Sequence, residues 1–470
     1  MRAPSIRRVP PWATIAVLAL CGMATSLQFT LAIPLLPSMP QILSAHAADT
    51  SWVVTVTLLT STIVTPLSSR LADMYGKRRM LLFSLGAMLV GSVVVALGGS
   101  LLTMLIGRGL QGCAAGAIPI GISLLREQLP SNRVGSAVAL MSATMGMGSA
   151  LGMPLSGVLH DALGWQSVFW FSAAAGAALG VGVLVCVSES SIRTHERFDV
   201  LGAALFSIPL TCGLLALSMG ARWGASVAIG LSVCCVGVLA AWIAWELRIR
   251  APFVDLRTMS RRPIVVTNTA SFLTTMAMLV NMLVTTQQVQ APHAGGLGLG
   301  ETITAAGLVM LPAGIAMILL SPLSGALLNR FGGKPVLIAG GLTMAAALLV
   351  RAWWDAGILE LTIGSTLVGV GTALSYAAAP TLIMASTPVT ETAAANGLNS
   401  MVRYLGTAVA SALIAFIASV MSVEVAGQAV LTRDAVHLAL YVAAAASALA
   451  AILALLLPTR APGLTTTKNP

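Results

Sequence analysis

Long apolar stretches, set off by charged residues or by clusters of Gly and Pro, follow one another along the whole chain. A membrane-crossing helix needs about 20 consecutive apolar residues, and backbone in lipid must satisfy its own hydrogen bonds. Stretches of that length cover approximately residues 13–36, 51–69, 80–99, 102–125, 134–158, 167–187, 200–220, 223–245, 264–287, 303–328, 336–353, 357–385, 398–421 and 437–457. The pattern therefore predicts an all-α polytopic membrane protein with 14 transmembrane helices.

Basic residues gather on one side of the predicted membrane. With the N-terminus in the cytoplasm, the 20 Lys and Arg residues on that side are Arg2, Arg7, Arg8, Arg70, Lys77, Arg78, Arg79, Arg126, Arg133, Arg193, Arg197, Arg248, Arg250, Arg257, Arg261, Arg262, Arg330, Lys334, Arg460 and Lys468. The opposite loops hold Arg222, Arg351 and Arg433, and two arginines lie within apolar stretches. Because Lys and Arg accumulate in short cytoplasmic loops, we expect both termini to be cytoplasmic.

Composition excludes a water-soluble globular domain. Hydrophobic residues make up 57% of the chain and charged residues 9%, where about a quarter is usual. The formal charge of +10 lies between apolar stretches, so no nucleic-acid partner is expected. All six Cys fall inside predicted helices, where Cys acts as a small apolar residue. We expect no disulfide framework, metal site or cofactor.

One segment occurs twice. The sequence PLSSRLADMYGKRRML from Pro66 returns as PLSGALLNRFGGKPVL from Pro322, 256 residues later. Such repeats are typical of secondary transporters, whose substrate site lies between the two halves. Eight predicted helices separate the copies, two more than two six-helix halves require. We expect a six-helix bundle over 1–190, a linker with two inserted helices over 191–262, and a second six-helix bundle over 263–470.

The first copy, at residues 68–82, resembles the loop motif of the major facilitator superfamily, most closely its fourteen-helix drug:proton antiporter family. The match consists of Leu71, Asp73, Gly76, Lys77 and Arg78. Ser69 stands where the family usually has Gly, which should loosen the closest helix approach without abolishing it. The resemblance implies the major facilitator fold and a cytoplasmic gate at this loop, with the helix start around Asn396 to Arg403 as its partner. An acidic side chain is favoured at a helix N-terminus, although the loop could serve only to orient the protein.

A second match, RGLQGCAAG at residues 108–116, resembles the family's fourth-helix motif through Arg108, Gln111 and Gly112. An Arg near mid-membrane costs about 2.5–3.5 kcal/mol on insertion scales, so it must face protein or a wet cavity. The resemblance implies a part in proton coupling or substrate response. The alternative is a structural Arg bound to helix carbonyls.

A third, partial match to the fifth-helix antiporter motif lies in GMGSALGMPLSG at residues 146–157, through Gly152, Pro154 and Gly157. Its glycines give a smooth face for close helix contact, and Pro154 should bend the helix. Glycine faces also occur in helices that only pack, so an antiport role and a packing role both remain open.

Polar side chains recur at helical spacing in the stretch 264–287 and just beyond it: Asn268, Ser271, Thr275, Asn281, Thr285 and Gln288. We interpret Asn268, Thr275, Asn281 and Gln288 as the lining of a central cavity, together with Gln28 and Arg403 and with Arg108 nearby. Alternatively the stripe only joins helices, and Arg403 snorkels to the interface. No Asp or Glu lies deep in any predicted helix, so we expect neutral, zwitterionic or anionic amphipathic substrates rather than dications.

The resemblance implies a monomeric exporter of small amphipathic, drug-like molecules, acting by alternating access across the bacterial cytoplasmic membrane with protons as the coupling ion. Proton coupling rests on the resemblance alone, because no buried carboxylate supports it. A facilitator or uptake transporter without proton coupling and a transport-dead membrane sensor remain alternatives. An enzyme is not expected, since no paired acids, metal-ligating histidines or nucleotide loop lie at a common depth.

Overall fold

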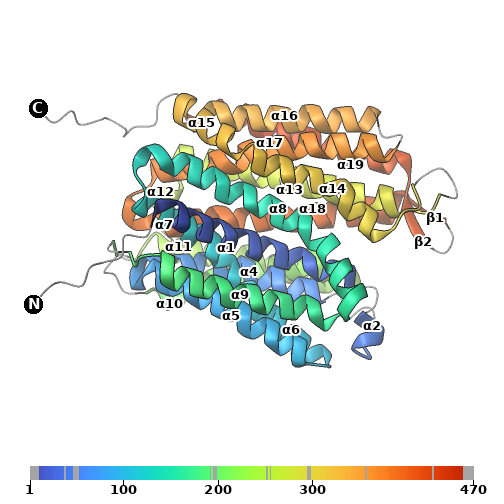
Figure 1. The fold of residues 1–470 in the computed structure, drawn as a ribbon, viewed down its shortest axis with the longest axis horizontal. Coiled ribbons are helices and arrows are strands. Elements are labelled where there is room, and N and C mark those ends of the chain that lie inside the picture. The colour runs from blue at the N-terminus through green and yellow to red at the C-terminus, as the bar shows by residue number, and fades with distance from the viewer. Residues whose placement is uncertain are drawn as a thin grey trace, which may run out of the picture.

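The protein is a bundle of helices that run side by side (Figure 1). The computed structural model describes residues 10–35, 39–45, 52–190, 192–193, 198–249, 252–254, 256–293, 298–354, 357–425 and 428–458. Of the predicted cytoplasmic cations, those outside the described residues are Arg2, Arg7, Arg8, Arg197, Arg250, Arg460 and Lys468.

The elements of the N-terminal part are α1 (Pro11–Leu31), η1 (Ile33–Leu35), α2 (Met39–Ile42), α4 (Trp52–Tyr75), α5 (Lys77–Leu97), α6 (Leu101–Gly112), η2 (Cys113–Gly116), α7 (Ala117–Gln128), α8 (Ser131–Leu163) and α9 (Gln166–Cys186). Two long helices follow, α10 (Val200–Trp223) and α11 (Ala225–Glu246). The C-terminal part consists of α12 (Leu256–Met259), α13 (Arg262–Gln290), α14 (Ile303–Leu319), α15 (Ser321–Phe331), α16 (Gly333–Trp353), α17 (Ile358–Ser386), η3 (Val389–Glu391), α18 (Thr392–Met421), β1 (Ser422–Val425), β2 (Gln428–Leu431) and α19 (Arg433–Ala454).

Many of these helices suit a bilayer. Among the described residues, 11 helices are long and apolar enough to cross it, or up to 13 if each of two bent pairs is one crossing. Helix α10 adds a shorter apolar segment, Val200–Ala216. The described part of the chain is thus almost entirely helical, with 11 to 13 helices suited to cross a membrane, and a count of 14 crossings stays a prediction.

Three predicted stretches are not straight helices. The stretch 102–125 is interrupted by η2, and the stretch 303–328 divides into α14 and α15, which meet at 44°. Pro322, at the start of α15, has no N–H to continue the hydrogen-bond ladder of α14. Within α8 the axis turns by 47° between Arg133–Ser149 and Pro154–Leu163. Hydropathy alone does not detect such breaks, nor did it predict the antiparallel hairpin of β1 and β2, which pairs Ser422 with Leu431.

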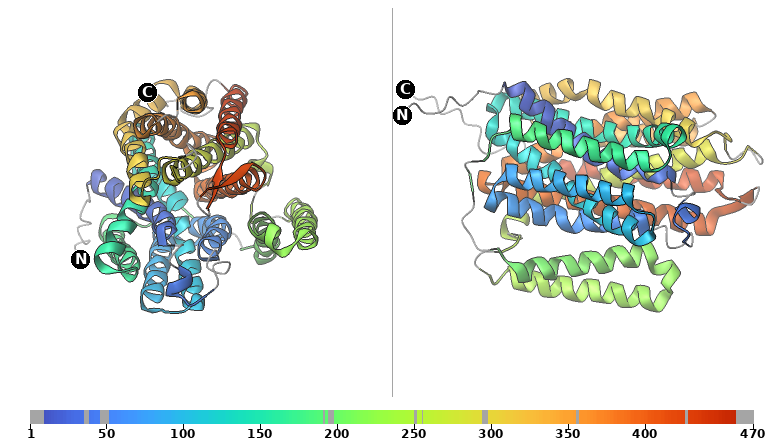
Figure 2. Two further views of the ribbon diagram at one scale, coloured as in Figure 1. Left: turned by 90° about the vertical axis from the view of Figure 1, so that its right-hand side faces the viewer. Right: turned by 60° about the horizontal axis from the view of Figure 1, so that its bottom comes forward.

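Each part of the chain has its own apolar core. One cluster joins α13, α16 and α19 through Val280, Leu348 and Leu440, and another joins α1, α5 and α7 through residues such as Leu18 and Ile120. Helices α10 and α11 pair with each other at the side of the bundle (Figure 2), where α10 contacts α4 and α18. Helices α10 and α11 therefore lie on the outside, beside the contact between the two parts.

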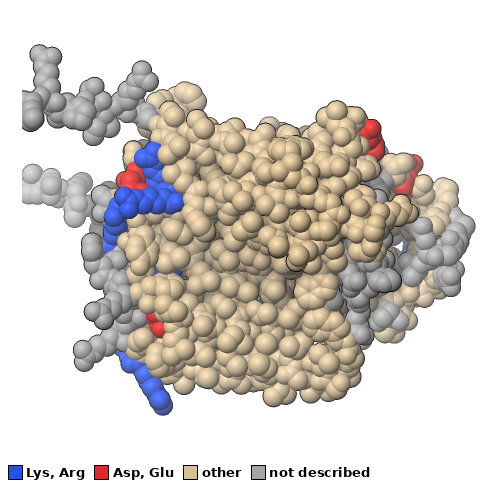
Figure 3. Space-filling view, turned by 90° about the horizontal axis from the view of Figure 1, so that it is seen from below, with Lys and Arg blue, Asp and Glu red and all other residues tan. Residues whose placement is uncertain are grey.

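Charge divides the described surface into ends. Basic side chains gather at one end, hereafter the basic end, and uncharged residues cover the middle of the bundle (Figure 3). The described members of the predicted cytoplasmic set are Arg70, Lys77, Arg78, Arg79, Arg126, Arg133, Arg193, Arg248, Arg257, Arg261, Arg262, Arg330 and Lys334. Helix α1 begins and α19 ends at this end (Figure 1).

Candidate functional site

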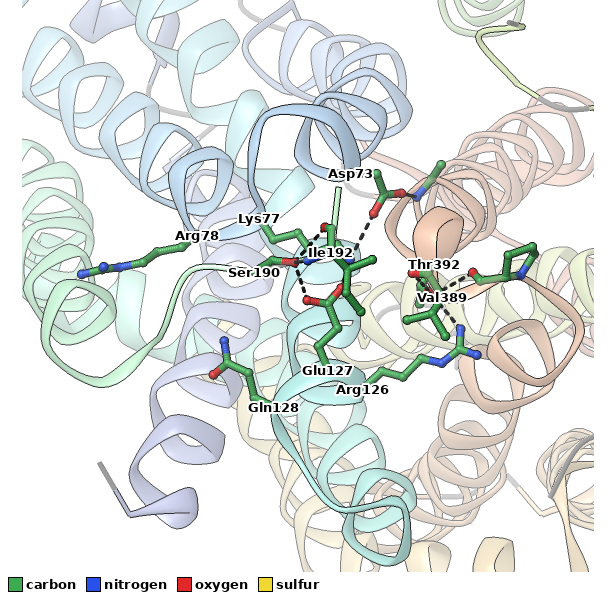
Figure 4. Close-up of polar contacts among 12 residues, drawn as sticks. Asp73, Lys77, Arg78, Arg126, Glu127, Gln128, Ser190, Ile192, Val389 and Thr392 are labelled. Carbon is green, nitrogen blue, oxygen red and sulfur yellow. Dashed lines mark hydrogen bonds and ion pairs between the residues drawn. The ribbon is translucent and has the colours of Figure 1, made fainter. Parts of the chain in front are cut away.

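At the basic end, Asp73 joins the two parts of the protein. It lies in the last turn of α4, and its Oδ2 accepts a hydrogen bond of 2.8 Å from the backbone N–H of Ala394 in the first turn of α18 (Figure 4). A carboxylate at this place meets the positive end of the helix dipole. The sequence suggested a partner for this loop between Asn396 and Arg403. The observed partner, Ala394, lies two residues before that segment. Lys77 Nζ lies 3.2 Å from Asp73 Oδ1, and neither side chain is exposed.

Residues at the end of α7 extend this network (Figure 4). Lys77 also pairs with Glu127, whose second oxygen accepts a 2.5 Å hydrogen bond from the Ser190 hydroxyl. Arg126 donates to Thr392 Oγ1 at 2.5 Å. Neither Arg126 nor Glu127 was among the predicted site residues, although an adjacent acid–base pair at the basic end of a predicted helix was a usable signal. The network thus ties α4, α5 and α7 to the start of α18.

Gly76 and Arg78 face a different partner. Gly76 has φ +120°, a conformation that side chains with a Cβ rarely adopt, and a Cβ there would lie 2.9 Å from Glu189 Oε1. Glu189 Oε1 also accepts from the backbone N–H of Arg78 at 3.1 Å, and the Arg78 side chain reaches the carbonyl of Leu184. The turn therefore directs Arg78 toward the end of α9, away from Asp73 (Figure 4).

The two halves approach each other most closely next to Ser69. A Cβ on Gly397 of α18 would lie 2.4 Å from Ser69 Oγ, so the glycine that this contact needs is on α18. The close approach is thus present with Ser69 in place of the family's Gly, because Gly397 supplies the space. The second repeat copy makes the matching contact: a Cβ on Gly325 of α15 would lie 2.6 Å from the Cα of Ser136 in α8. Each copy of the repeat thus packs against the other half.

Arg108 lies inside the first half. It is 1% exposed, and its guanidinium donates to the carbonyls of Val53 at 3.2 Å and Gln28 at 3.3 Å and to Gln111 Oε1 at 2.8 Å. Gln28 in turn donates to the Gln111 carbonyl at 2.9 Å. Gly112 lets α6 approach α4, since a Cβ there would lie 2.8 Å from the carbonyl of Thr57. These contacts match the structural alternative, an Arg held by helix carbonyls.

The glycine-rich part of α8 lies between α1 and α14. A Cβ on Gly152 would lie 1.8 Å from Thr30 Oγ1 of α1, and the ring of Pro154 lies 2.7 Å from the place of a Cβ on Gly307 of α14. Gly157 has more room, with Thr304 Oγ1 at 3.4 Å. Because α8 contacts both halves, its bend near Pro154 lies at their junction.

The polar stripe of α13 makes its described contacts within the second half, whereas Gln28 and Arg108 contact residues of the first half. A cavity shared by these residues stays a prediction. Asn268 Oδ1 accepts from Asn399 of α18 at 2.9 Å, and Thr275 Oγ1 lies 3.2 Å from the Tyr376 hydroxyl of α17. Asn281 and Gln288 accept from an arginine of α16. Buried amides need such partners, so the stripe chiefly joins α13 to its neighbours.

Two further arginines are buried in the second half. Arg403 is 6% exposed, and its Cζ lies 4.8 Å from the centre of the Tyr376 ring, so it does not snorkel to the interface. Arg351, expected in an outer loop, lies in the last turn of α16 and is 1% exposed. It donates to Asn281 Oδ1, and at 2.7 Å to Gln288 Oε1. Asn281 and Gln288 are seven residues apart, which is two helical turns, so both amides lie on the same face of α13. This spacing was the signal in the sequence that could have revealed the site.

A pocket lies between the halves, formed by α8 on one side and by α13, α14 and α17 on the other. It is open on one side, and the empty space counted together with the solvent at its mouth is about 600 Å³. Its lining consists of Gly146, Ser149, Met278, Asn281, Met282, Gly307, Met310, Ala313, Gly314, Met317, Ser365, Val368, Gly369 and Thr372. Flexible, polarizable Met side chains adapt to ligands of different shape. Asn281 is the one predicted lining residue that this pocket includes.

Comparison with known proteins extends this description. The model described as Major Facilitator Superfamily matches residues 18–312 and 265–470. The tetracenomycin C resistance and export protein of Streptomyces glaucescens is 26% identical over 410 residues, which cover 86% of this chain and 75% of that protein. The multidrug resistance protein Stp of Mycobacterium tuberculosis is 28% identical over 387 residues, covering 81% and 70%. The probable actinorhodin transporter of Streptomyces coelicolor is 27% identical over 421 residues, covering 86% and 72%.

Two solved structures share the fold. The human organic anion transporter MFSD10 (TETRAN) superposes with a TM-score of 0.67 at 17% identity, covering 95% of this chain and 99% of that one. The proton:xylose symporter XylE superposes with a TM-score of 0.65 at 12% identity, covering 94% of both chains. At these identities the likeness concerns the arrangement of helices.

Proposed function

Because the chain belongs to the Major Facilitator Superfamily, we propose that this membrane transporter exports small amphipathic, drug-like molecules across the bacterial cytoplasmic membrane by alternating access, in exchange for protons. The observation that carries the proposal is the position of the pocket, which lies between two halves that touch each other at the basic end. Relatives that are named for drug resistance and antibiotic export support the direction of transport.

Transport on this proposal requires the halves, residues 1–190 and 263–470, to separate at the basic end. In the present arrangement Asp73 holds the start of α18, and Gly397 and Gly325 bring the halves together there. Breaking these contacts would open the pocket toward the cytoplasm, and reforming them would close it. The inserted helices over 191–262 stay at the side and require no contact with the substrate.

Among the residues that the structure describes, the acidic candidates for proton exchange lie near helix ends or in connections. Every Asp and Glu that the structure describes lies within about a turn of a helix end, in β1 or in a connection. Asp73 and Glu127 are the acids of the gate network, and protonating either would weaken its pairing with Lys77. This distribution also favours a second candidate function, a facilitator without proton coupling.

Flux in vesicles tests the proposal. Purified protein is reconstituted, and transport of three fluorescent probes is followed with and without an imposed pH gradient: neutral N-phenyl-1-naphthylamine, anionic 1-anilinonaphthalene-8-sulfonate and dicationic propidium. We expect gradient-dependent transport of the first two. Flux of the same rate with and without the pH gradient would indicate a facilitator. Faster transport of propidium than of the other two probes would contradict the expected substrate class. Absence of any flux would indicate a sensor.

A further inference from the structure

The internal repeat relates two buried arginines that come from different helices. Helices α5 and α16 begin at Lys77 and Gly333, 256 residues apart, which places Val95 and Arg351 at the same position of their helices. The next helices, α6 and α17, begin at Leu101 and Ile358, so that Arg108 corresponds to Ser365. The second half therefore has Ser where the first half has its buried Arg.

The contacts of two equivalent glycines confirm this register. A Cβ on Gly107 would lie 2.4 Å from Val95 Cγ2, and a Cβ on Gly364 would lie 2.3 Å from Arg351 Cγ. In the second half the long Arg351 side chain thus crosses α17 over Gly364. Its guanidinium reaches the first helix of its half, as the Arg108 guanidinium does at Gln28. The buried arginine of the second half thus lies on α16, whereas that of the first half lies on α6. Ser365, at the position equivalent to Arg108, lines the pocket.

Arg351 also fixes the orientation of a pocket residue. A guanidinium only donates hydrogen bonds, so the side-chain atom of Asn281 that faces it must be the amide oxygen Oδ1. The Asn281 amide nitrogen donates to none of the described residues, and two N–H donors remain for a ligand. The hydroxyl of Thr372, by contrast, already donates to the Val368 carbonyl at 2.9 Å. Asn281 is therefore the main donor of a pocket otherwise lined largely by Met and Gly.

We propose that Arg351, acting through Asn281, makes this pocket selective for amphipathic molecules that carry an anionic or strongly accepting oxygen, such as a sulfonate, carboxylate, phenolate or quinone carbonyl. The apolar body of the ligand packs on the methionines, and its oxygen accepts from Asn281. The positive charge behind Asn281 favours a negative ligand, because Coulomb interactions are strong where water is excluded. This inference rests on the proposed function and names the substrate class of that exporter. Arg351 is a positioning residue here, since it acts through another side chain.

Binding of two matched dyes tests the inference. 1-Anilinonaphthalene-8-sulfonate and N-phenyl-1-naphthylamine share their aromatic body, and only the first carries a sulfonate. Their dissociation constants are measured by fluorescence with protein in lipid nanodiscs, after subtraction of protein-free nanodiscs. We expect tighter binding of the sulfonate by the native protein. We expect Arg351→Gln to weaken sulfonate binding about tenfold and to leave the neutral dye within about twofold, as for loss of a charged hydrogen-bonding partner.

Four further variants separate positioning from folding. Arg433→Gln removes an exposed positive charge at the start of α19 and should change neither dye. Gly364→Leu keeps Arg351 but blocks its path, so it should reproduce the effect of Arg351→Gln. Arg351→Val weakens sulfonate binding, and adding Ser365→Arg, which copies the arrangement of the first half, should restore it.

Some outcomes would overturn the inference. Two results would show that Arg351 does not determine the preference of the pocket for anionic ligands. One is equal affinity of the native protein for both dyes, and the other is equal weakening of both by Arg351→Gln. Dye binding is measured without transport, so a protein that shows the predicted selectivity but exports neither dye would contradict only the proposed function.

Discussion

Replacing Asp73 by Asn tests whether the contact with α18 holds the basic end closed. The change keeps the shape of the side chain but removes its charge. Asn still accepts from the Ala394 N–H, 2.8 Å away in the native protein, but as a neutral acceptor at about half the strength. It also loses the ion pair with Lys77 at 3.2 Å, after which Lys77 keeps Glu127.

The expected effect on opening follows from the contact with α18, because Lys77 lies in the same half as Asp73 and their ion pair does not cross between the halves. A buried hydrogen bond to a charged group contributes about 1.5–3 kcal/mol, and the attraction between a carboxylate and a helix N-terminus adds at most about 2 kcal/mol. Since the neutral amide of Asn retains part of the hydrogen-bond energy, we expect the free-energy difference between the closed and open states to change by about 2 kcal/mol in favour of the open basic end. This corresponds to about a thirtyfold change in the ratio of the two states.

Distances between spin labels measure this ratio. Tyr75 and Val389, one in each half at the basic end, are 54% and 40% exposed and can be labelled in a background without the native cysteines. In Asp73→Asn we expect the population with long label distances to grow. Asp161→Asn, the same change at an exposed position of α8, serves as the control. Identical distance distributions and identical transport in Asp73→Asn and the native protein would refute the reasoning.

Three other changes have outcomes that the packing predicts. Gly397→Val should also open the basic end in the label assay, because a Cβ there meets Ser69 at 2.4 Å; an unchanged distribution would show that this contact is dispensable. Arg108→Ala should lower the thermal stability of the purified protein by about 3 kcal/mol or more, since buried acceptors left without donors cost about 1–3 kcal/mol each; an unaltered melting temperature would argue against these bonds. Gly148→Val should destabilise by about 1–3 kcal/mol through overpacking against the α1 backbone, 2.3 Å from its Cβ, while Gly157→Ala should change stability by less than about 0.5 kcal/mol. Equal melting temperatures for these two variants would contradict the packing of α8.

The sequence predicted well those features that depend on one helix or on a repeat. Hydropathy revealed the helical membrane fold, and the repeated segment located the loop whose Asp73 meets α18. The polar stripe of α13 was visible too, but its partners lie on three other helices, and periodicity on one helix does not say which neighbours it faces. For this reason the sequence alone did not reveal the contacts of the stripe with α16, α17 and α18.

Arg351 shows the same limit of single-helix reasoning. Its place beside Trp353 and Trp354, at the end of an apolar stretch, is typical of a loop residue. Only the packing of α16 on α17 at Gly364, and the amides of α13 beyond it, make a buried position favourable. The same holds for Ser69, where the compensating glycine is more than three hundred residues away, at Gly397.

The most direct test of the whole account is transport by a protein whose halves are linked at the basic end. Tyr75→Cys and Val389→Cys, in a background without other cysteines, place one exposed thiol in each half at the basic end. Flux of the two anilinonaphthalene dyes is measured in vesicles before and after the thiols are joined by a bifunctional maleimide whose spacer contains a disulfide, and again after the spacer is reduced. The account predicts that cross-linking stops transport and that reduction restores it. Equal flux in the cross-linked and the reduced protein would contradict the claim that the halves separate at this end.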